Sequence, residues 1–427
     1  MPFGDILIIG AACRLPAADS LDSFRDAMAN GVDAIVDAPS ARWESARYFH
    51  PAQHVPGKTY VFSRGQLANV FRFDPGLFGI SPREAMQMDP QQLLMLEVAS
   101  EAFEDAGLPR SRVAGRTIGV YVGASFTDHA TYRFGDVSSV EPYFMTGAAM
   151  STISNRVSHV FDLHGPSLTV DTACSSSLVA LHLACEALRS GDIDTAVVGG
   201  VNLLLTPQPF VGFAQATMLS PTGRSRPFSA AADGYVRSEG AGAVILRRAD
   251  ALDAADRPRA AILGTGVNSD GHTPGISLPN GTAQAALLRQ VYDGAGVDPD
   301  RLIYFEAHGT GTKAGDPIES GAIGQALAVR RASPLPIGSA KSNFGHLESA
   351  SGMVGLLKAV SIAETRRIPP LLHCGELNGN IPFADLNLAP VRAPLAASDR
   401  ADGAVGVNSF GFGGTNAPTI ACALVPP

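Results

Sequence analysis

The chain has 427 residues, of which 45% are hydrophobic and 17% charged, a composition typical of a globular protein with a substantial core. Its formal net charge of −8 argues against nucleic acid as the main partner, because phosphate binding needs a surplus of lysine and arginine. The longest apolar stretch, residues 196–214, is interrupted by two prolines and several polar residues. We therefore expect no transmembrane helix and no membrane partner.

Short apolar runs alternate with helical patterns along the chain. The runs of strand length are residues 6–10, 118–122, 196–205, 243–246, 303–305 and 405–407. The helical patterns are residues 90–106, 178–189, 282–292 and 353–364. Near-continuous apolar runs are typical of strands buried on both faces, and this alternation predicts an α/β protein with helices covering central sheets. Residues 38–70 predict a long surface excursion, and residues 388–403 a connection rich in proline and alanine.

The two ends of the chain carry signals of their own. The apolar run 6–12 ends at Cys13 but no lysine or arginine precedes it, so it predicts a buried strand rather than a signal peptide or lipid-attachment segment. At the other end, Val425, Pro426 and Pro427 would suit a domain excised from a longer protein.

The five cysteines are an odd number with no C-x-x-C spacing, which argues against a disulfide framework or a zinc site. They are Cys13, Cys174, Cys185, Cys374 and Cys422. We expect a reducing, cytoplasmic setting and no bound metal.

The strongest chemical signal is Cys174 in residues 171–178, where a short alternating strand runs into an apolar helix. The free N–H groups and the dipole at a helix N-terminus favour a thiolate, so this placement predicts a nucleophile with a lowered thiol pKa. The alternative is that Cys174 is a small buried hydrophobic residue, as free cysteines usually are.

Two histidines follow strand-like runs in the second half of the chain. His308 lies in residues 306–317, whose Gly/Thr loop lacks the phosphate-loop spacing because Lys313 precedes alanine. His346 lies in residues 341–348, before a helical pattern of small residues. Loops at one end of the strands converge in layered α/β folds, so both histidines could meet Cys174. A lone histidine is more often structural, and a metal site would need paired ligand spacing that is absent here.

A fourth segment, residues 407–416, is a glycine-rich turn after a strand. It resembles nucleotide-binding turns only weakly. Its glycines could instead let the backbone approach a ligand and offer N–H groups to a developing oxyanion.

These four segments, in this order and spacing, are similar to the motif set of the β-ketoacyl synthases, and the polyketide synthase branch is the nearest match. Residues 78–85, 89–92, 163–167, 233–235 and 239–240 resemble the same branch. The likeness runs from Ile6 to Asn416. It implies the thiolase fold, a five-layered αβαβα body with two similar βαβαβαββ halves, here residues 1–250 with the cysteine and residues 251–427 with the histidines.

The resemblance also implies roles. Cys174 would accept an acyl chain, and the backbone N–H groups of Cys174 and Phe412 would form an oxyanion hole. His308 and His346 would assist decarboxylation of a malonyl-type extender and stabilise the enolate. The product would be a β-ketoacyl thioester of polyketide biosynthesis.

Further residues carry supporting roles by the same resemblance. Lys341 would lie beside the histidines, paired with Glu319. Thr310 and Thr312 would touch the phosphopantetheine arm of an acyl carrier protein. The acyl pocket would lie near the two aromatic residues Phe213 and Tyr235.

The partners implied are an acyl carrier protein, a second copy of the chain in a homodimer, and neighbouring synthase domains such as an acyltransferase. No cofactor would be bound to the domain itself, since the substrate arrives on phosphopantetheine. We expect carrier docking at a basic cluster of Arg224, Arg226 and Arg237.

Two positions depart from the family pattern: Leu93 stands where arginine is common, and Pro418 where histidine is common. Neither carries chemistry in the match, but both affect the local packing or interface expected. A degradative thiolase would need a second cysteine in residues 408–416, an initiating ketosynthase would replace one histidine by asparagine, and a loading-type decarboxylase would lack Cys174. A domain that only holds or passes acyl chains remains the alternative. The sequence leaves open the length of the acyl chain, the identity of the extender, whether the parent synthase is modular or iterative, and which domains flank this one.

Overall fold

The computed structural model describes residues 5–423 except 137 and 139, so the end at Val425 to Pro427 lies outside the described residues. The chain folds into two repeats of one βαβαβαββ pattern. The first repeat comprises β1 (Ile6–Arg14), α4 (Pro90–Asp105), β4 (Ile118–Gly123), α8 (Ser151–Phe161), β5 (Ser167–Val170), α9 (Ser176–Ser190), β6 (Thr195–Asn202) and β8 (Gly240–Arg248). The second comprises β9 (Ala260–Thr265), α11 (Gly281–Gly294), β11 (Leu302–Glu306), α12 (Gly315–Ala326), β12 (Leu335–Gly338), α14 (Ser351–Thr365), β16 (Ala404–Phe410) and β17 (Thr415–Ala423).

The two repeats have the same strand order. Each sheet runs from the third strand through the second, fourth and fifth to the first, as β5-β4-β6-β8-β1 and as β12-β11-β16-β17-β9. The first strands β1 and β9 pair antiparallel, with Ile6 opposite Ile262, and so join the sheets edge to edge. β14 (Leu388–Pro390) extends the second sheet beyond β12.

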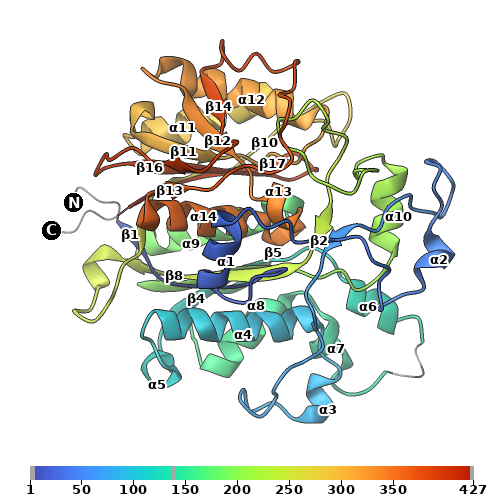
Figure 1. Cartoon of the computed structure of the whole chain (residues 1–427). Helices are drawn as coiled ribbons and strands as arrows, with labels where there is room; N and C mark the ends of the chain where they lie inside the picture. The colour runs from blue at the N-terminus through green and yellow to red at the C-terminus, as the bar shows by residue number, and fades with distance from the viewer. Residues whose placement is uncertain (1–4, 137, 139, 424–427) are drawn as a thin grey trace.

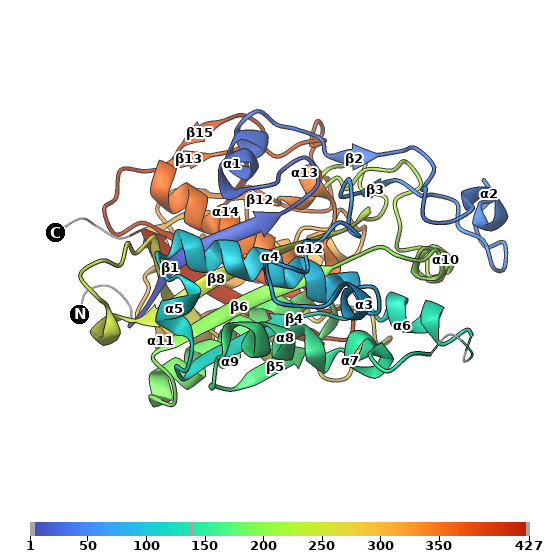
Figure 2. The ribbon, with the colours of Figure 1, turned by 90° about the horizontal axis from the view of Figure 1, so that it is seen from below.

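Helices and sheets stack in five layers, as predicted. In Figure 1, α4 and α8 lie below the first sheet, α9 and α14 between the sheets, and α11 and α12 above the second. Figure 2 shows α4 crossing the strands of the first sheet. The two middle helices are apolar on most sides, α14 being buried along almost its whole length, because each must pack against a sheet on either face.

The predicted elements are present, and most extend by a few residues. Residues 6–12 form part of β1, where Cys13 is fully buried, so the prediction of a strand is confirmed. Residues 38–70 hold only the short α2 (Ser45–Tyr48) and β3 (Arg64–Gly65), but they are not merely a surface excursion. Tyr60, Val61 and Phe62 pack into a small core with Phe210 of α10 (Gln208–Gln215).

The shorter elements connect the repeats or cover their ends. They are α1 (Leu21–Ala29), β2 (Ile35–Val36), α3 (Pro82–Ala85), α5 (Arg110–Val113), α6 (Asp128–Arg133), α7 (Phe144–Ala148), β7 (Arg237–Ser238), β10 (Asn268–Ser269), α13 (Lys341–Phe344), β13 (Arg367–Ile368) and β15 (Leu395–Ala396). Among the described residues, no helix combines the length and apolarity needed to cross a membrane.

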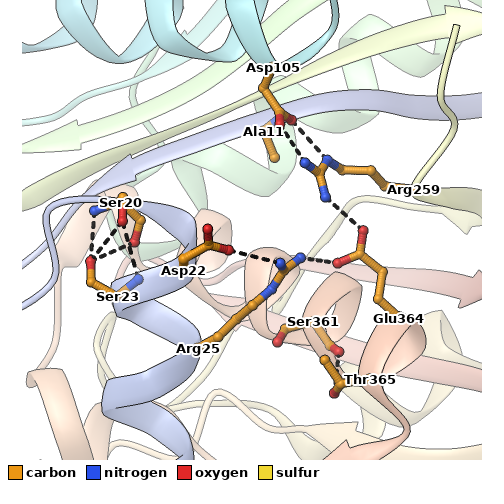
Figure 3. A network of polar contacts seen from close by, with 10 residues as sticks. All are labelled: Ala11, Ser20, Asp22, Ser23, Arg25, Asp105, Arg259, Ser361, Glu364 and Thr365. Carbon is orange, nitrogen blue, oxygen red and sulfur yellow. Dashed lines mark hydrogen bonds and ion pairs between the residues drawn. The ribbon is translucent and has the colours of Figure 1, made fainter.

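A polar network ties the layers together at one edge (Figure 3). Arg259, just before β9, donates to Asp105 of α4 at 2.8 Å and to Glu364 of α14 at 2.8 Å. Glu364 also pairs with Arg25 of α1, and Asp105 accepts the backbone N–H of Ala11 in β1. The network therefore connects an outer helix, the first sheet and the middle helix layer.

Candidate active site

Cys174 lies in a tight turn between β5 and α9, within the 3₁₀ helix η2 (Ala173–Ser175). Ala173 adopts a left-handed conformation with φ 57°, and its N–H donates to Asp171 at 2.9 Å. The Cys174 carbonyl accepts the Ser409 hydroxyl at 2.7 Å. These contacts hold the turn, so the thiol lies at the start of the middle-layer helix as the sequence predicted.

The glycine-rich turn approaches this backbone closely. A Cβ added at Gly411 would lie 2.3 Å from the carbonyl oxygen of Thr172, so only glycine fits there. The close approach brings the backbone N–H of Phe412 to the thiol of Cys174, where it lowers the thiol pKa together with the N–H of Cys174 itself. The two predicted oxyanion donors therefore face the same sulfur.

The prediction of a depressed thiol pKa is wrong in this structure. Burial, reinforced by the Glu348 carboxylate, raises the pKa of Cys174 to about 12. The two N–H groups and the charge of Lys341 lower it without offsetting the loss of solvent. The helix terminus can be recognised in the sequence, whereas the burial of the thiol arises only in the folded chain.

His308 follows β11, and its ring is oriented by the backbone. The N–H of Phe410 donates to its Nδ1 at 3.3 Å, so the neutral ring carries its proton on Nε2. Burial, the charge of Lys341 and the neighbouring His346 lower the pKa of His308 well below 6.5. His308 is therefore a neutral hydrogen-bond donor at pH 7.

His346 is held in the same way. The N–H of Glu348 donates to its Nδ1 at 3.1 Å, which again leaves the proton on Nε2. Burial, Lys341 and Arg237 lower the pKa of His346 well below 6.5. The rings of His308 and His346 stand nearly perpendicular, with centroids 5.4 Å apart.

The cysteine and the two histidines meet at one point: their ligand-type atoms all lie within 4.8 Å of one another. Such a cluster could hold a metal ion by distance alone. Binding through Nε2 would move each ring proton to Nδ1, where it would face a backbone N–H. The donor set therefore fits an anion between the two Nε2–H groups better than a cation.

The carboxylate of Glu319 on α12 binds the backbone of the His308 loop and does not pair with Lys341. This carboxylate accepts the N–H of His308 at 2.7 Å, the N–H of Gly309 at 2.8 Å and the Asn408 side chain at 3.0 Å. No direct ion pair joins Lys341 to Glu319 in the described structure, so the predicted pairing is wrong. The Glu319 charge acts on Lys341 from a greater distance, because the carboxylate is turned toward the loop backbone.

A cavity of about 560 Å³ opens onto the three side chains. Its wall includes Thr310, Thr312, Tyr235 and Phe412, together with the three meeting side chains. The hydroxyls of the two threonines lie 3.1 Å apart. Phe213 packs behind this wall, its ring centroid 6.0 Å from those of Tyr235 and Phe412. The predicted binding residues are thus gathered around one space.

The expected basic cluster for carrier docking is not formed. Arg237 is fully buried and paired with Glu348. Arg224 donates to Asp33 and Asp37, and Arg226 lies 3.7 Å from Asp233. The prediction is wrong because arginines close in sequence here neutralise acids of their own chain.

The fold is that of solved ketosynthase domains, and it brings one cysteine and two histidines together. The family models described as β-ketoacyl synthase N-terminal and C-terminal domains match residues 4–251 and 259–375. The chain belongs to the β-ketoacyl synthase family.

Two curated relatives are similar over nearly the whole chain. The partially reducing polyketide synthase men1 of Menisporopsis theobromae is 44% identical over 97% of this chain and 16% of its own length. The polyketide synthase ThaG of Burkholderia thailandensis is 44% identical over 97% of this chain and 8% of its own length. The chain therefore spans less than a fifth of the length of these relatives.

Among solved structures, the oxazolomycin ketosynthase domain OzmH KS7 of Streptomyces albus has a TM-score of 0.93 at 37% identity, covering 99% of this chain and 76% of that one. The ketosynthase from module 6 of the Bacillus subtilis bacillaene synthase has a TM-score of 0.90 at 34% identity, covering 99% and 72%.

Three residues that shape the site were not assigned roles from the sequence. Glu348 orients His346, Asn408 supports Glu319, and the buried carboxylate of Asp316 accepts the N–H of Gly311 beside the threonines. All three lie within or next to the motif segments. Their roles depend on backbone direction, which the spacing of residues does not reveal.

Proposed function

We propose that this chain catalyses a decarboxylative Claisen condensation, joining a cysteine-bound acyl chain to a malonyl-type extender carried on an acyl carrier protein. The halves 1–250 and 251–427 supply the nucleophile and the two histidines, respectively. The observation that carries the proposal is the meeting of Cys174 with two histidines, both neutral and both presenting an Nε2–H.

In the first step, the Cys174 sulfur attacks the carbonyl of an acyl thioester. The oxyanion accepts hydrogen bonds from the backbone N–H groups of Cys174 and Phe412. The carrier thiolate leaves and takes the proton that the cysteine lost. Capturing the chain as a covalent thioester divides one difficult condensation into two easier steps.

In the second step, the malonyl thioester loses carbon dioxide and becomes an enolate. The Nε2–H groups of His308 and His346 donate to the thioester oxygen where the negative charge develops. The enolate carbon attacks the acyl group, and the Cys174 thiolate leaves, giving a β-ketoacyl carrier thioester. Lys341 adds a positive charge close to all three groups.

The carrier's phosphopantetheine arm would enter the cavity along Thr310 and Thr312. Thr310 and Thr312 offer two neighbouring hydroxyls there, and Tyr235 with Phe213 behind it supplies an aromatic wall for the acyl chain. The large relatives are named polyketide synthases, which favours further synthase domains such as an acyltransferase as neighbours.

Mutation separates the two steps. Cys174→Ala should abolish acyl loading, followed by intact mass. His308→Ala and His346→Ala should still load but lose carbon dioxide release from malonyl carrier by roughly 10² to 10³-fold. The matched control is His182→Ala, a partly buried histidine on α9 that bonds Thr265 instead.

The outcomes distinguish the enzyme from a domain that only holds acyl chains. Full loading without any carbon dioxide release in the unmutated chain would favour the holding role. Condensation at the parent rate in either histidine variant would contradict the role proposed for that histidine.

We also propose a homodimer that continues the first sheet through β5. This strand ends the sheet, and Leu168 on it is 46% exposed with no proline or charge to block pairing. Leu168→Asp should shift sedimentation toward a monomer. Leu395→Asp on β15, at a site 44% exposed, is the control and should not.

A further inference from the structure

A buried ion pair that neither proposed step uses directly lies beside His346, and its charges act on the pKa values of Cys174 and His346. Arg237 on β7 is 0% exposed and Glu348 is 4% exposed. The Nε of Arg237 donates to one carboxylate oxygen of Glu348 at 2.5 Å, and a terminal nitrogen donates to the other at 2.8 Å. This bidentate contact fixes both the position and the orientation of the carboxylate.

Aromatic rings fix the arginine from its other sides. The guanidinium carbon of Arg237 lies 4.7 Å from the ring centroid of Phe210, 5.2 Å from that of Phe126 and 5.4 Å from that of Phe213. Its remaining terminal nitrogen is buried without a hydrogen bond. The faces of the rings stabilise the charge there, so the arginine has little freedom to move.

Glu348 stands in a strained backbone conformation that orients the histidine. Its φ is 49°, in the left-handed region that a side chain with a Cβ disfavours. In that conformation its N–H donates to Nδ1 of His346 at 3.1 Å. The same residue thus points its backbone at the histidine and its carboxylate at Arg237.

The contacts form a closed ring. The N–H of His346 donates to the carbonyl of Val236 at 2.7 Å, and the N–H of Ser238 donates to the carbonyl of His346 at 2.8 Å. The backbone on either side of Arg237 therefore holds the backbone of His346. The side chain of Arg237 then holds Glu348, whose N–H returns to the imidazole.

We infer that Arg237 and Glu348 are a positioning pair: their contact holds the Glu348 backbone in the left-handed conformation that keeps the His346 proton on Nε2. The inference rests on the proposed condensation and names a specific control of its second step. Loss of the pair should impair decarboxylation without slowing acyl loading, since loading uses the thiol and two backbone N–H groups, and removing the Glu348 carboxylate, which raises the pKa of the thiol, does not hinder its ionisation.

The test replaces the whole pair, because removing one partner would leave an uncompensated buried charge. Arg237→Met with Glu348→Leu conserves volume but removes the contact. It should release carbon dioxide from malonyl carrier at least tenfold more slowly, while loading does not slow by more than threefold. Arg237→Met with Glu348→Gly also lacks the contact, but glycine adopts positive φ freely. The glycine variant should regain at least fivefold of the lost decarboxylation.

A matched control replaces another buried pair, Arg247 with Asp256 on and after β8, by methionine and leucine. Arg247 lies seven residues beyond Gly240 along the strand, about 23 Å away at the usual rise. This variant should slow loading and decarboxylation equally, if at all. Equal loss of both steps in the Arg237/Glu348 variants, or no advantage of glycine over leucine, would overturn the inference.

A tautomer measurement tests the same inference without enzyme activity. In the chain labelled with ¹⁵N-histidine, with His346 assigned by comparison with His346→Gln, Nδ1 should show the shift of an unprotonated nitrogen. The leucine double variant should show a mixture of tautomers, and the glycine variant should return toward the parent. If the leucine double variant does not fold, the Arg237→Lys variant is measured in its place. Lysine keeps the positive charge but cannot make the bidentate contact, so this variant should also show a mixture of tautomers. An unchanged tautomer would refute the pair's role even if condensation itself were confirmed.

Discussion

The thiol of Cys174 provides a sharp test of the site's electrostatics, because the structure and the sequence argument predict opposite behaviour. With a pKa of about 12, the thiolate fraction is about 10⁻⁶ at pH 6 and about 10⁻³ at pH 9. Alkylation, which proceeds through the thiolate, should therefore accelerate about tenfold per pH unit, or about 1000-fold over that range. A depressed pKa would give a rate that levels off within it.

The assay is iodoacetamide alkylation of the unacylated chain from pH 6 to 9, followed by intact mass. Cys174→Ala is the background control, and the other four cysteines are all buried. Lys341→Met should slow the reaction at every pH, because the Lys341 charge lowers the pKa of the thiol. The slope should stay near one logarithmic unit per pH unit in both proteins.

A plateau with a midpoint between pH 6 and 8 would refute the reasoning. It would mean that the N–H groups of Cys174 and Phe412 and the charge of Lys341 outweigh burial, as the helix-terminus argument alone predicts. An unchanged rate in Lys341→Met would separately show that this lysine does not act on the thiol.

Three further results are expected. Burial lowers the pKa of His308 and His346 well below 6.5, so the unfolded chain gains protons as pH falls through about 6.5 while the folded chain does not. The free energy of unfolding should therefore fall by up to about 2.7 kcal/mol per pH unit, measured by urea unfolding at pH 7.5 and 5.5. The fall should be smaller in the double variant His308→Gln with His346→Gln. Ala173→Gly should leave the free energy of unfolding unchanged or up to about 1 kcal/mol higher, whereas Ala173→Val should lower it by about 1–2 kcal/mol, because φ is 57° there; a valine variant as stable as the parent would contradict the strain. Arg259→Gln should lower it by about 1 kcal/mol in dilute buffer and by less in 1 M salt, and a salt-independent loss would argue against the ion-pair network.

The sequence predicted what depends on pattern along the chain. Apolar runs identified β11 and β16, which end at the His308 segment and at the glycine-rich turn, and the start of α9 lies two residues from the expected Leu178. It missed α12, because Gly315, Pro317 and further small residues give a weak helical signal. That helix forms through packing of Ala322 and Ile323 into the core, a tertiary effect that local propensity does not contain.

The predictions that failed all concern distances across the fold. Whether Lys341 contacts Glu319 depends on how two loops of the second repeat lie against each other, and whether Arg237 is exposed depends on how it meets Glu348 of the other repeat. The depressed thiol pKa failed for the same reason, since burial of Cys174 is a property of the assembled site. Motif spacing placed these residues in one site but could not orient their side chains within it.

Each of the three side chains that meet in the site has a residue with positive φ close to it in the sequence. Ala173 before Cys174, Gly309 after His308 and Glu348 two residues after His346 have φ values of 57°, 39° and 49°. In a regular strand or helix the backbone continues along the axis of the element. A single residue in the left-handed conformation changes the direction of the backbone at that residue, and so changes where the neighbouring side chain points. The first repeat contributes the turn at Ala173, and the second contributes the turns at Gly309 and Glu348. The site's geometry is therefore set by the backbone at three turns, so substitutions beside the catalytic side chains should affect its chemistry as strongly as substitutions that touch the substrate.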